Sequence, residues 1–258
     1  MQAVADVARL AGTEALRHYG KNVSVETKGD GSPVTIADRG AEQLARNWIE
    51  TRFPDDGIMG EEFGVIRPEA RRRWIIDPID GTKSFVRTVP LWGTLVAIAE
   101  GDSVIAGAAY FPALDEIGVA AVGAGSWWNG SRCTVSSVSD ISAATVLTSD
   151  TRFAKTPERG EGWNMLSDTA AISRTWGDCY GYLLVATGRA EVMVDAVVAD
   201  WDTAALMPLI TEAGGSFTSW DGVETAFGAS AIATNAALAR EAREILSNRR
   251  PPNAAFQR

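Results

Sequence analysis

The chain has 258 residues, of which 46% are hydrophobic and 22% are charged, so it is long enough for one large folded domain or two smaller ones. Its net charge of −9 repels nucleic acid and acidic lipid, and no apolar run reaches the roughly 20 residues that span a bilayer, so neither partner is expected. Its two cysteines, Cys133 and Cys179, have no metal-binding spacing, which favours a reducing compartment and predicts a cytoplasmic location.

The N-terminal region predicts two helices joined by an extended segment at 24–28 and a glycine-rich loop. Apolar residues recur at helical spacing in 1–19. This stretch holds the one histidine, His18, which leaves little material for a histidine-based catalytic triad or zinc site. Thr35 and Asp38 have the spacing of a capping box, so a second helix is expected to carry Asp38 in its first turn.

The middle of the chain favours β-structure. A buried strand is predicted at 74–76, and two further strands at 91–100 and 104–111 are joined by a tight turn at 101–102. The stretch 135–142 then becomes polar and serine-rich, as is typical of a seam between domains. An antiparallel sheet is therefore expected before this seam.

Beyond the seam, strands and helices alternate, which predicts a layered α/β arrangement. Strands are expected at 144–148 and 190–195, and helices at 165–172, 178–187 and 203–213. We predict an N-terminal half over 1–138, a C-terminal half over 139–250 and a disordered tail over 251–258.

The sequence feature that most strongly suggests chemistry directly follows the strand at 74–76. Asp77 and Asp80 place two carboxylates at the end of that strand, while Gly81 relieves the turn. If a helix begins at Gly81 and Thr82, its free backbone N–H groups form an anion site beside the carboxylates. Alone, two aspartates at this spacing are more often a simple helix cap.

Two further acidic positions strengthen the case for a metal site. Glu61 follows a loop, and Asp202 directly precedes the helix expected at 203–213. Each alone would be read as a solvated acid or a helix N-cap. A set of oxygen ligands without histidine or cysteine favours a hard cation, so Mg²⁺ is expected, with Mn²⁺ as a possible substitute.

The segments at 60–62, 74–82 and 201–215 together resemble the inositol monophosphatase family, and the resemblance covers nearly the whole chain. It implies an α+β fold built as a layered αβαβα sandwich, a homodimer, and two or three Mg²⁺ ions where the two halves meet. The implied metal ligands are Glu61, Asp77, the carbonyl of Ile79, Asp80 and Asp202.

The resemblance also implies roles in catalysis. Metal-bound water would attack the phosphorus in line, and Thr82, Asp38 and Glu61 would orient that water and help to deprotonate it. The N–H groups of Gly81 and Thr82 would bind phosphate. Lys28 matches a loop lysine of the family near the metals, although a single lysine is normally a surface residue. For Asp38, a purely structural role in the capping box is an equal alternative.

Within the family, the stretches at 80–85, 90–94 and 176–182 look most like the histidinol-phosphate phosphatase branch, which acts in histidine biosynthesis. Histidinol phosphate carries an ammonium group and an imidazole, so carboxylates away from the metals would favour its binding. The expected substrate contacts are Asp80, Asp178, Asp195 and Arg174.

Other functions stay open at this point. The first alternative is an inositol-1-monophosphatase, or a related phosphatase acting on a sugar or nucleotide phosphate, and the second is a catalytically silent metal-binding protein. A dinucleotide-binding dehydrogenase is excluded because 123–128 lacks the third glycine of the fingerprint, and the chain has no P-loop that would indicate a kinase.

Overall fold

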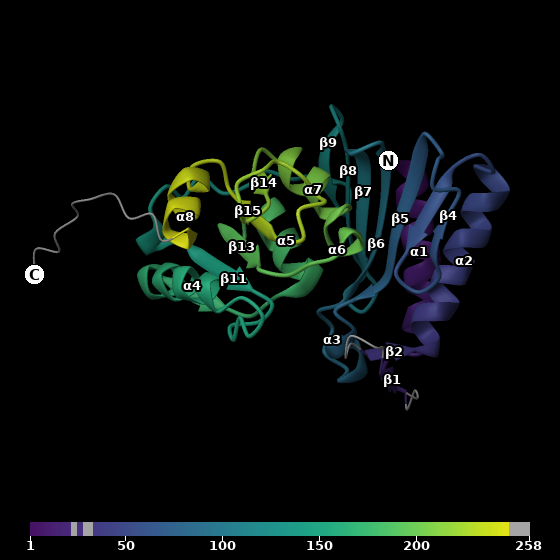
Figure 1. The fold of residues 1–258 in the computed structure, drawn as a ribbon, viewed down its shortest axis with the longest axis horizontal. Helices are drawn as coiled ribbons and strands as arrows, with labels where there is room; N and C mark the ends of the chain where they lie inside the picture. The colour runs from purple at the N-terminus through teal and green to yellow at the C-terminus, as the bar shows by residue number, and fades with distance from the viewer. Residues whose placement is uncertain (22–24, 28–32, 248–258) are drawn as a thin grey trace, which may run out of the picture.

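The computed structural model describes residues 1–21, 25–27 and 33–247. Figure 1 shows two helices, a large sheet, a central group of short helices, a second sheet and two outer helices, stacked in that order. The predicted α+β fold with αβαβα layers is confirmed. None of the helices in these described residues combines the length and apolarity needed to cross a membrane.

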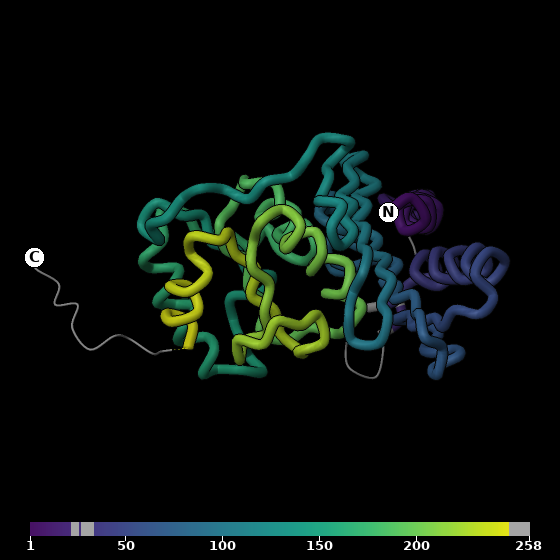
Figure 2. Tube along the Cα trace, turned by 90° about the horizontal axis from the view of Figure 1, so that it is seen from above, coloured from purple at the N-terminus to yellow at the C-terminus, as the bar shows by residue number. Residues whose placement is uncertain are grey.

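The first helical layer consists of α1 (Gln2–Leu16) and α2 (Ile36–Arg52), which pack against each other and against one face of the first sheet. In Figure 2 both helices lie on the side of that sheet facing away from the C-terminal half. Alanines dominate the buried stripes of these helices, and their small side chains allow the backbones to approach closely. The capping box predicted from Thr35 and Asp38 is present at the start of α2.

The first sheet has eight strands in the order β10-β9-β8-β7-β6-β5-β3-β4, and a separate two-stranded ladder precedes it. Only β3 and β5 pair in parallel; the other neighbours are antiparallel. The strands are β1 (Val25–Thr27), β2 (Pro33–Thr35), β3 (Gly57–Gly60), β4 (Gly64–Ile66), β5 (Arg72–Asp80), β6 (Gly93–Glu100), β7 (Ser103–Phe111), β8 (Glu116–Ala121), β9 (Gly125–Trp128) and β10 (Ser131–Arg132).

The short helix α3 (Thr82–Val86) follows β5, and three helices lie between the sheets: α5 (Asp178–Ala186), α6 (Asp200–Thr203) and α7 (Leu206–Thr211). Their packing on the first sheet is close. A Cβ atom at Gly107 of β7 would lie 2.3 Å from the carbonyl oxygen of Ala205, so only glycine fits there. This contact fixes how near the two halves of the molecule come.

The second sheet has five strands in the order β12-β11-β13-β15-β14, covered on its outer face by two helices. The elements are β11 (Thr145–Thr148), β12 (Ile172–Arg174), β13 (Val192–Asp195), β14 (Ser216–Thr218), β15 (Ala231–Thr234), α4 (Pro157–Thr169) and α8 (Ala239–Leu246), with a 3-10 turn at Ile141–Ala143. The predicted boundary at 138/139 lies between the last strand of the first sheet and this turn. The tail at 251–258 lies outside the described residues.

Two helices differ from their prediction. The helix expected at 165–172 instead runs from Pro157 to Thr169, because Ile172 joins the edge strand β12 beside β11. The helix expected at 203–213 is split into α6 and α7. Pro208 has no N–H to donate to the carbonyl of the residue four positions earlier, which explains why a second helix begins here. Because α6 begins at Asp200, Asp202 lies inside this helix and not directly before it as predicted.

Candidate active site

The site begins where β3 and β5 end side by side. Because these strands run in parallel, their last residues meet at one edge of the sheet, and the N–H of Glu61 donates to the carbonyl of Ile76 at 3.2 Å. This bond places Glu61 beside Asp77, which is 2% exposed and accepts the Ile79 N–H at 3.0 Å. Buried Thr94 donates its hydroxyl to the Pro78 carbonyl at 2.7 Å and fixes the turn from the neighbouring strand.

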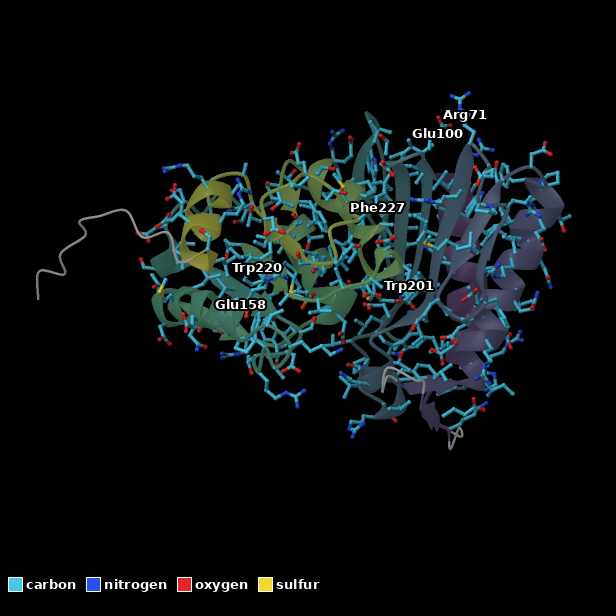
Figure 3. The ribbon with its side chains drawn as sticks, viewed as in Figure 1. Arg71, Glu100, Glu158, Trp201, Trp220 and Phe227 are labelled. Atoms are coloured by element: carbon cyan, nitrogen blue, oxygen red, sulfur yellow. The ribbon has the colours of Figure 1, made fainter. Side chains whose placement is uncertain are left out.

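The other half of the molecule supplies a third carboxylate. Asp202 accepts the Ala199 N–H at 2.8 Å in the first turn of α6, and its neighbour Trp201 lies where this helix meets the first sheet (Figure 3). Carboxylate oxygens of Asp77, Asp80 and Asp202 all lie within 4.8 Å of one another. Asp80 also accepts the Cys179 N–H of α5 at 2.5 Å, so the end of β5 in the first sheet is linked directly to α5 through the site.

The electrostatics of this cluster favour a bound cation. Burial, followed by the charges of Glu61, Asp80 and Asp202, raises the pKa of Asp77 well above its ordinary value. Burial also raises the pKa of Asp80, and it raises the pKa of Asp202 to about 6. Carboxylates that face one another at this range repel, and a divalent cation between them removes the repulsion. The donor set is entirely oxygen, which fits Mg²⁺.

Ile79, Gly81 and Thr82 meet in the turn between β5 and α3. The Thr82 hydroxyl donates to the Ile79 carbonyl at 3.0 Å, so the residue expected to orient water lies next to the carbonyl expected to bind metal. Gly81 has φ of +81°, and a Cβ atom there would lie 3.1 Å from both the Leu91 carbonyl and the Asp178 carboxylate. Glycine is thus favoured by its left-handed conformation, and the space for a side chain is tight.

Asp38 forms the predicted capping box and has one carboxylate oxygen that this role does not use. One carboxylate oxygen accepts the N–H and the hydroxyl of Thr35, each at 2.7 Å, as a capping box requires. The other oxygen is buried and has no hydrogen-bond partner among the described residues. Burial raises the pKa of Asp38, and the nearby charge of Glu61 raises it further. Lys28 lies outside the described residues.

A cavity of about 400 Å³ opens beside the carboxylate cluster and brings together four of the predicted site residues, Asp80, Asp178, Asp195 and Asp202. Asp195, at the end of β13, accepts the Ser149 N–H at 3.1 Å and the Tyr182 hydroxyl at 2.9 Å. Burial raises the pKa of Asp195 to about 7. Burial likewise raises the pKa of Asp178 to about 6, although the charge of Lys83 lowers it.

Arg174 is not brought into this cavity. It lies exposed on the edge strand β12, and its guanidinium donates to the carbonyl of the preceding Ser173 at 2.7 Å. The sequence resemblance placed it among the substrate contacts, but within this chain Arg174 does not line the cavity that holds Asp178 and Asp195.

Several cavity residues were missed from the sequence. The Ser149 hydroxyl accepts the backbone N–H of Asp178 at 2.8 Å, and the Ser149 N–H donates to the Asp195 carboxylate, so Ser149 connects these two residues. Tyr182, one helical turn beyond Asp178, donates its hydroxyl to the Asp195 carboxylate as well. Lys83 lines the wall as well. The position of Ser149 directly after the strand predicted at 144–148 was a usable signal, since ligands commonly bind at strand ends.

The comparisons with known proteins identify the family of the chain. The model of the inositol monophosphatase family matches residues 1–250. A histidinol-phosphatase of Chlorobaculum parvum is 40% identical over 96% of each chain, one of Mycobacterium tuberculosis is 40% identical over 84% of this chain and 85% of its own, and an inositol-1-monophosphatase of Mesorhizobium japonicum is 30% identical over 86% of each.

The solved structures give the same picture of the fold. The extragenic suppressor protein suhB of Bartonella henselae has a TM-score of 0.90 at 28% identity, covering 95% of this chain and 97% of its own. The IMPase of Thermotoga maritima has a TM-score of 0.86 at 30% identity and covers 94% of each chain.

Proposed function

Since this chain belongs to the inositol monophosphatase family and is a phosphoric monoester hydrolase, we propose that it hydrolyses histidinol phosphate to histidinol and phosphate in a Mg²⁺-dependent reaction. The observation that supports this proposal most directly is the convergence of Asp77, Asp80 and Asp202 within 4.8 Å, beside a cavity that holds two further aspartates.

Each residue of the cluster has a chemical task in this proposal. Glu61, Asp77, Asp80, Asp202 and the Ile79 carbonyl would hold the metal ions. Bound Mg²⁺ supplies charge neutralisation for the phosphate and acidifies a coordinated water. The Thr82 hydroxyl, adjacent to the Ile79 carbonyl, would orient this water, and the unpaired oxygen of Asp38 would accept its proton.

The phosphate contacts follow from the turn after β5. The N–H groups of Gly81 and Thr82 stand at the start of α3, and the absence of a side chain at Gly81 leaves its backbone accessible beside the carboxylates. N–H groups at such a position stabilise negative charge on a phosphate oxygen. The phosphate would therefore lie between these N–H groups and the metals.

The organic part of the substrate would occupy the cavity. Asp178 and Asp195 present carboxylates there that are not part of the metal cluster, and the Asp178 side chain lies next to Gly81, close to the phosphate position. A cationic ammonium or imidazolium group gains charge-assisted hydrogen bonds from such carboxylates. The curated relatives named histidinol-phosphatase support the same substrate.

The test is phosphate release from histidinol phosphate and from inositol 1-phosphate, each with Mg²⁺ and with EDTA, on the wild type and on Asp178→Asn. We expect Mg²⁺-dependent cleavage that favours histidinol phosphate, with a preference about ten-fold weaker in the variant because one charge-assisted contact is lost. A wild-type preference for inositol 1-phosphate would overturn the substrate and retain the chemistry. No metal-dependent release from either ester would favour a silent metal-binding protein.

We also propose the homodimer that the resemblance implies and the cytoplasmic location that the two cysteines predict. Sedimentation of the purified protein at several concentrations tests the dimer directly. A sedimentation coefficient of the monomer at all concentrations would contradict it.

A further inference from the structure

A buried ion pair on α2 lies outside the group of residues assigned to the site. Glu42 is fully buried and Arg46 is 5% exposed, and the Arg46 Nε donates to Glu42 Oε1 at 2.7 Å. Burying two charges in a protein interior is costly unless further hydrogen bonds satisfy them. The partners of this pair therefore indicate what it does.

Those partners all lie directly after Glu61, in the turn and at the start of β4. Glu42 accepts the N–H of Glu62 at 2.7 Å and the N–H of Phe63 at 3.2 Å. Arg46 donates to the carbonyl of Gly64, and its guanidinium lies 5.8 Å from the centre of the Phe63 ring. The pair thus binds three consecutive residues, two in the turn between β3 and β4 and the first residue of β4.

The approach of Glu42 to this turn also constrains Gly60, the last residue of β3. A Cβ atom at Gly60 would lie 2.0 Å from Glu42 Oε1 and 2.8 Å from a guanidinium nitrogen of Arg46. Both contacts are far shorter than a van der Waals separation, so the glycine before Glu61 makes room for the pair. The buried side chains of α2 therefore require a residue without a side chain at position 60, directly before Glu61.

Glu61 is held from two sides as a result. On one side its N–H bonds to β5 through the Ile76 carbonyl, and on the other the next three residues are bound to α2. Asp38 lies one helical turn before Glu42 on the same face of α2, and its pKa responds to the charge of Glu61. One buried polar face of α2 therefore carries Asp38 and also binds the residues that follow Glu61.

We propose that Glu42 and Arg46 are positioning residues of the metal site: they hold the turn at 61–64 so that the Glu61 carboxylate faces Asp77. The inference rests on the proposed function only in taking Glu61 as a metal ligand. Partners of this kind orient ligands without touching the metal.

The test compares Glu42→Gln with the wild type. Glutamine keeps the size of the side chain but loses the charge that pairs with Arg46 and one acceptor for the turn. We expect Mn²⁺ to bind about ten-fold more weakly, as measured by the electron paramagnetic resonance of free Mn²⁺, since loss of an outer partner typically has this effect on metal affinity. Half-saturating Mg²⁺ for phosphate release should rise in parallel, while kcat at saturating Mg²⁺ stays within about two-fold.

The matched control is Ile49→Val, which removes a buried methylene from the same helix away from the turn. Ile49→Val should lower the melting temperature without changing Mn²⁺ affinity. In Arg46→Lys, which retains the charge, the Mn²⁺ affinity should lie between those of the wild type and Glu42→Gln. Arg46→Lys also serves as the test if Glu42→Gln does not fold. Amide hydrogen exchange at Glu62 and Phe63 should be faster in Glu42→Gln with or without metal.

Equal Mn²⁺ affinity in Glu42→Gln and Ile49→Val would overturn the positioning role. This outcome is distinct from failure of the proposed function, in which the wild type itself binds no Mn²⁺ and releases no phosphate.

Discussion

Two groups of carboxylates lie at the junction of the two sheets, and they differ in what surrounds them. Asp77, Asp80 and Asp202 face one another within 4.8 Å, and burial together with the charges of neighbouring carboxylates raises their pKa values. Asp195, on the wall of the adjacent cavity, has each of its oxygens bound by a donor instead, the Ser149 N–H and the Tyr182 hydroxyl.

The difference shows how one acidic region can serve two ligands. Carboxylates that converge without enough donors between them need a small cation of high charge, whereas a carboxylate oriented by fixed donors can accept a larger organic cation or a hydroxyl group. Under the proposed function, the first group holds metal and the second recognises substrate. The following changes test this division.

Replacing a member of the converging group should have the largest effect. In Asp77→Asn we expect kcat/KM to fall by about a thousand-fold or more, because a ligand charge at the centre of the site is lost. The melting temperature in EDTA should not fall, since asparagine keeps the size of the side chain and carries no charge among the other carboxylates. Steady-state kinetics and thermal melts measure both effects, with exposed Asp55→Asn as the control. Activity within ten-fold of the wild type would place the metal ligands elsewhere.

The affinity of the converging group for Mg²⁺ should depend on pH. Asp202, with a pKa of about 6, and Asp77 and Asp80, with raised pKa values, must release protons when a cation binds. Affinity should therefore increase about a hundred-fold from about pH 5.5 to about pH 7.5, with protons released on binding. Titration calorimetry in buffers of different ionisation enthalpy measures both. Affinity independent of pH would contradict the assigned charge state.

Asp195 should affect stability in a pH-dependent way. Its pKa rises from 3.8 to about 7 in the folded protein, so the folded state binds more protons between these values and stability falls as pH increases through this range. Relative to the wild type, Asp195→Asn should gain on the order of 2 kcal/mol in unfolding free energy between about pH 5 and about pH 8. Urea unfolding in EDTA provides the measurement, with exposed Asp168→Asn as the control. A pH-independent difference would show that Asp195 is ionised throughout.

The smallest expected effect concerns the donor that orients Asp195. Tyr182→Phe removes the hydroxyl that donates to Oδ2 at 2.9 Å, and loss of one hydrogen bond to a charged group corresponds to about a ten-fold rise in KM for histidinol phosphate. Glycerol phosphate, which has no cationic group, should show little change. Equal effects on the two esters would indicate a general loss of cavity structure and not a loss of recognition.

The sequence alone was enough to predict those parts of the site whose residues are close together along the chain. Asp77, Asp80, Gly81 and Thr82 lie within one turn, so their shared position at a strand end and helix start followed from spacing and from the conformational freedom of glycine. The capping box at Asp38 was equally local. The resemblance over the whole chain added the layered fold, which the structure confirms.

Only the tertiary structure decided which distant residues meet. The Cys179 N–H that binds Asp80 is 99 positions away along the chain, and no periodicity in the sequence encodes such a contact. Sequence periodicity likewise does not encode the approach of Asp178 to Gly81 or the hydrogen bond between the turn at 61–64 and Glu42. The helix expected at 165–172 ends earlier, at Thr169, for a related reason, because sheet pairing of Ile172 outweighed local helical spacing. Packing between the halves, which depends on both surfaces at once, converts these local motifs into one site.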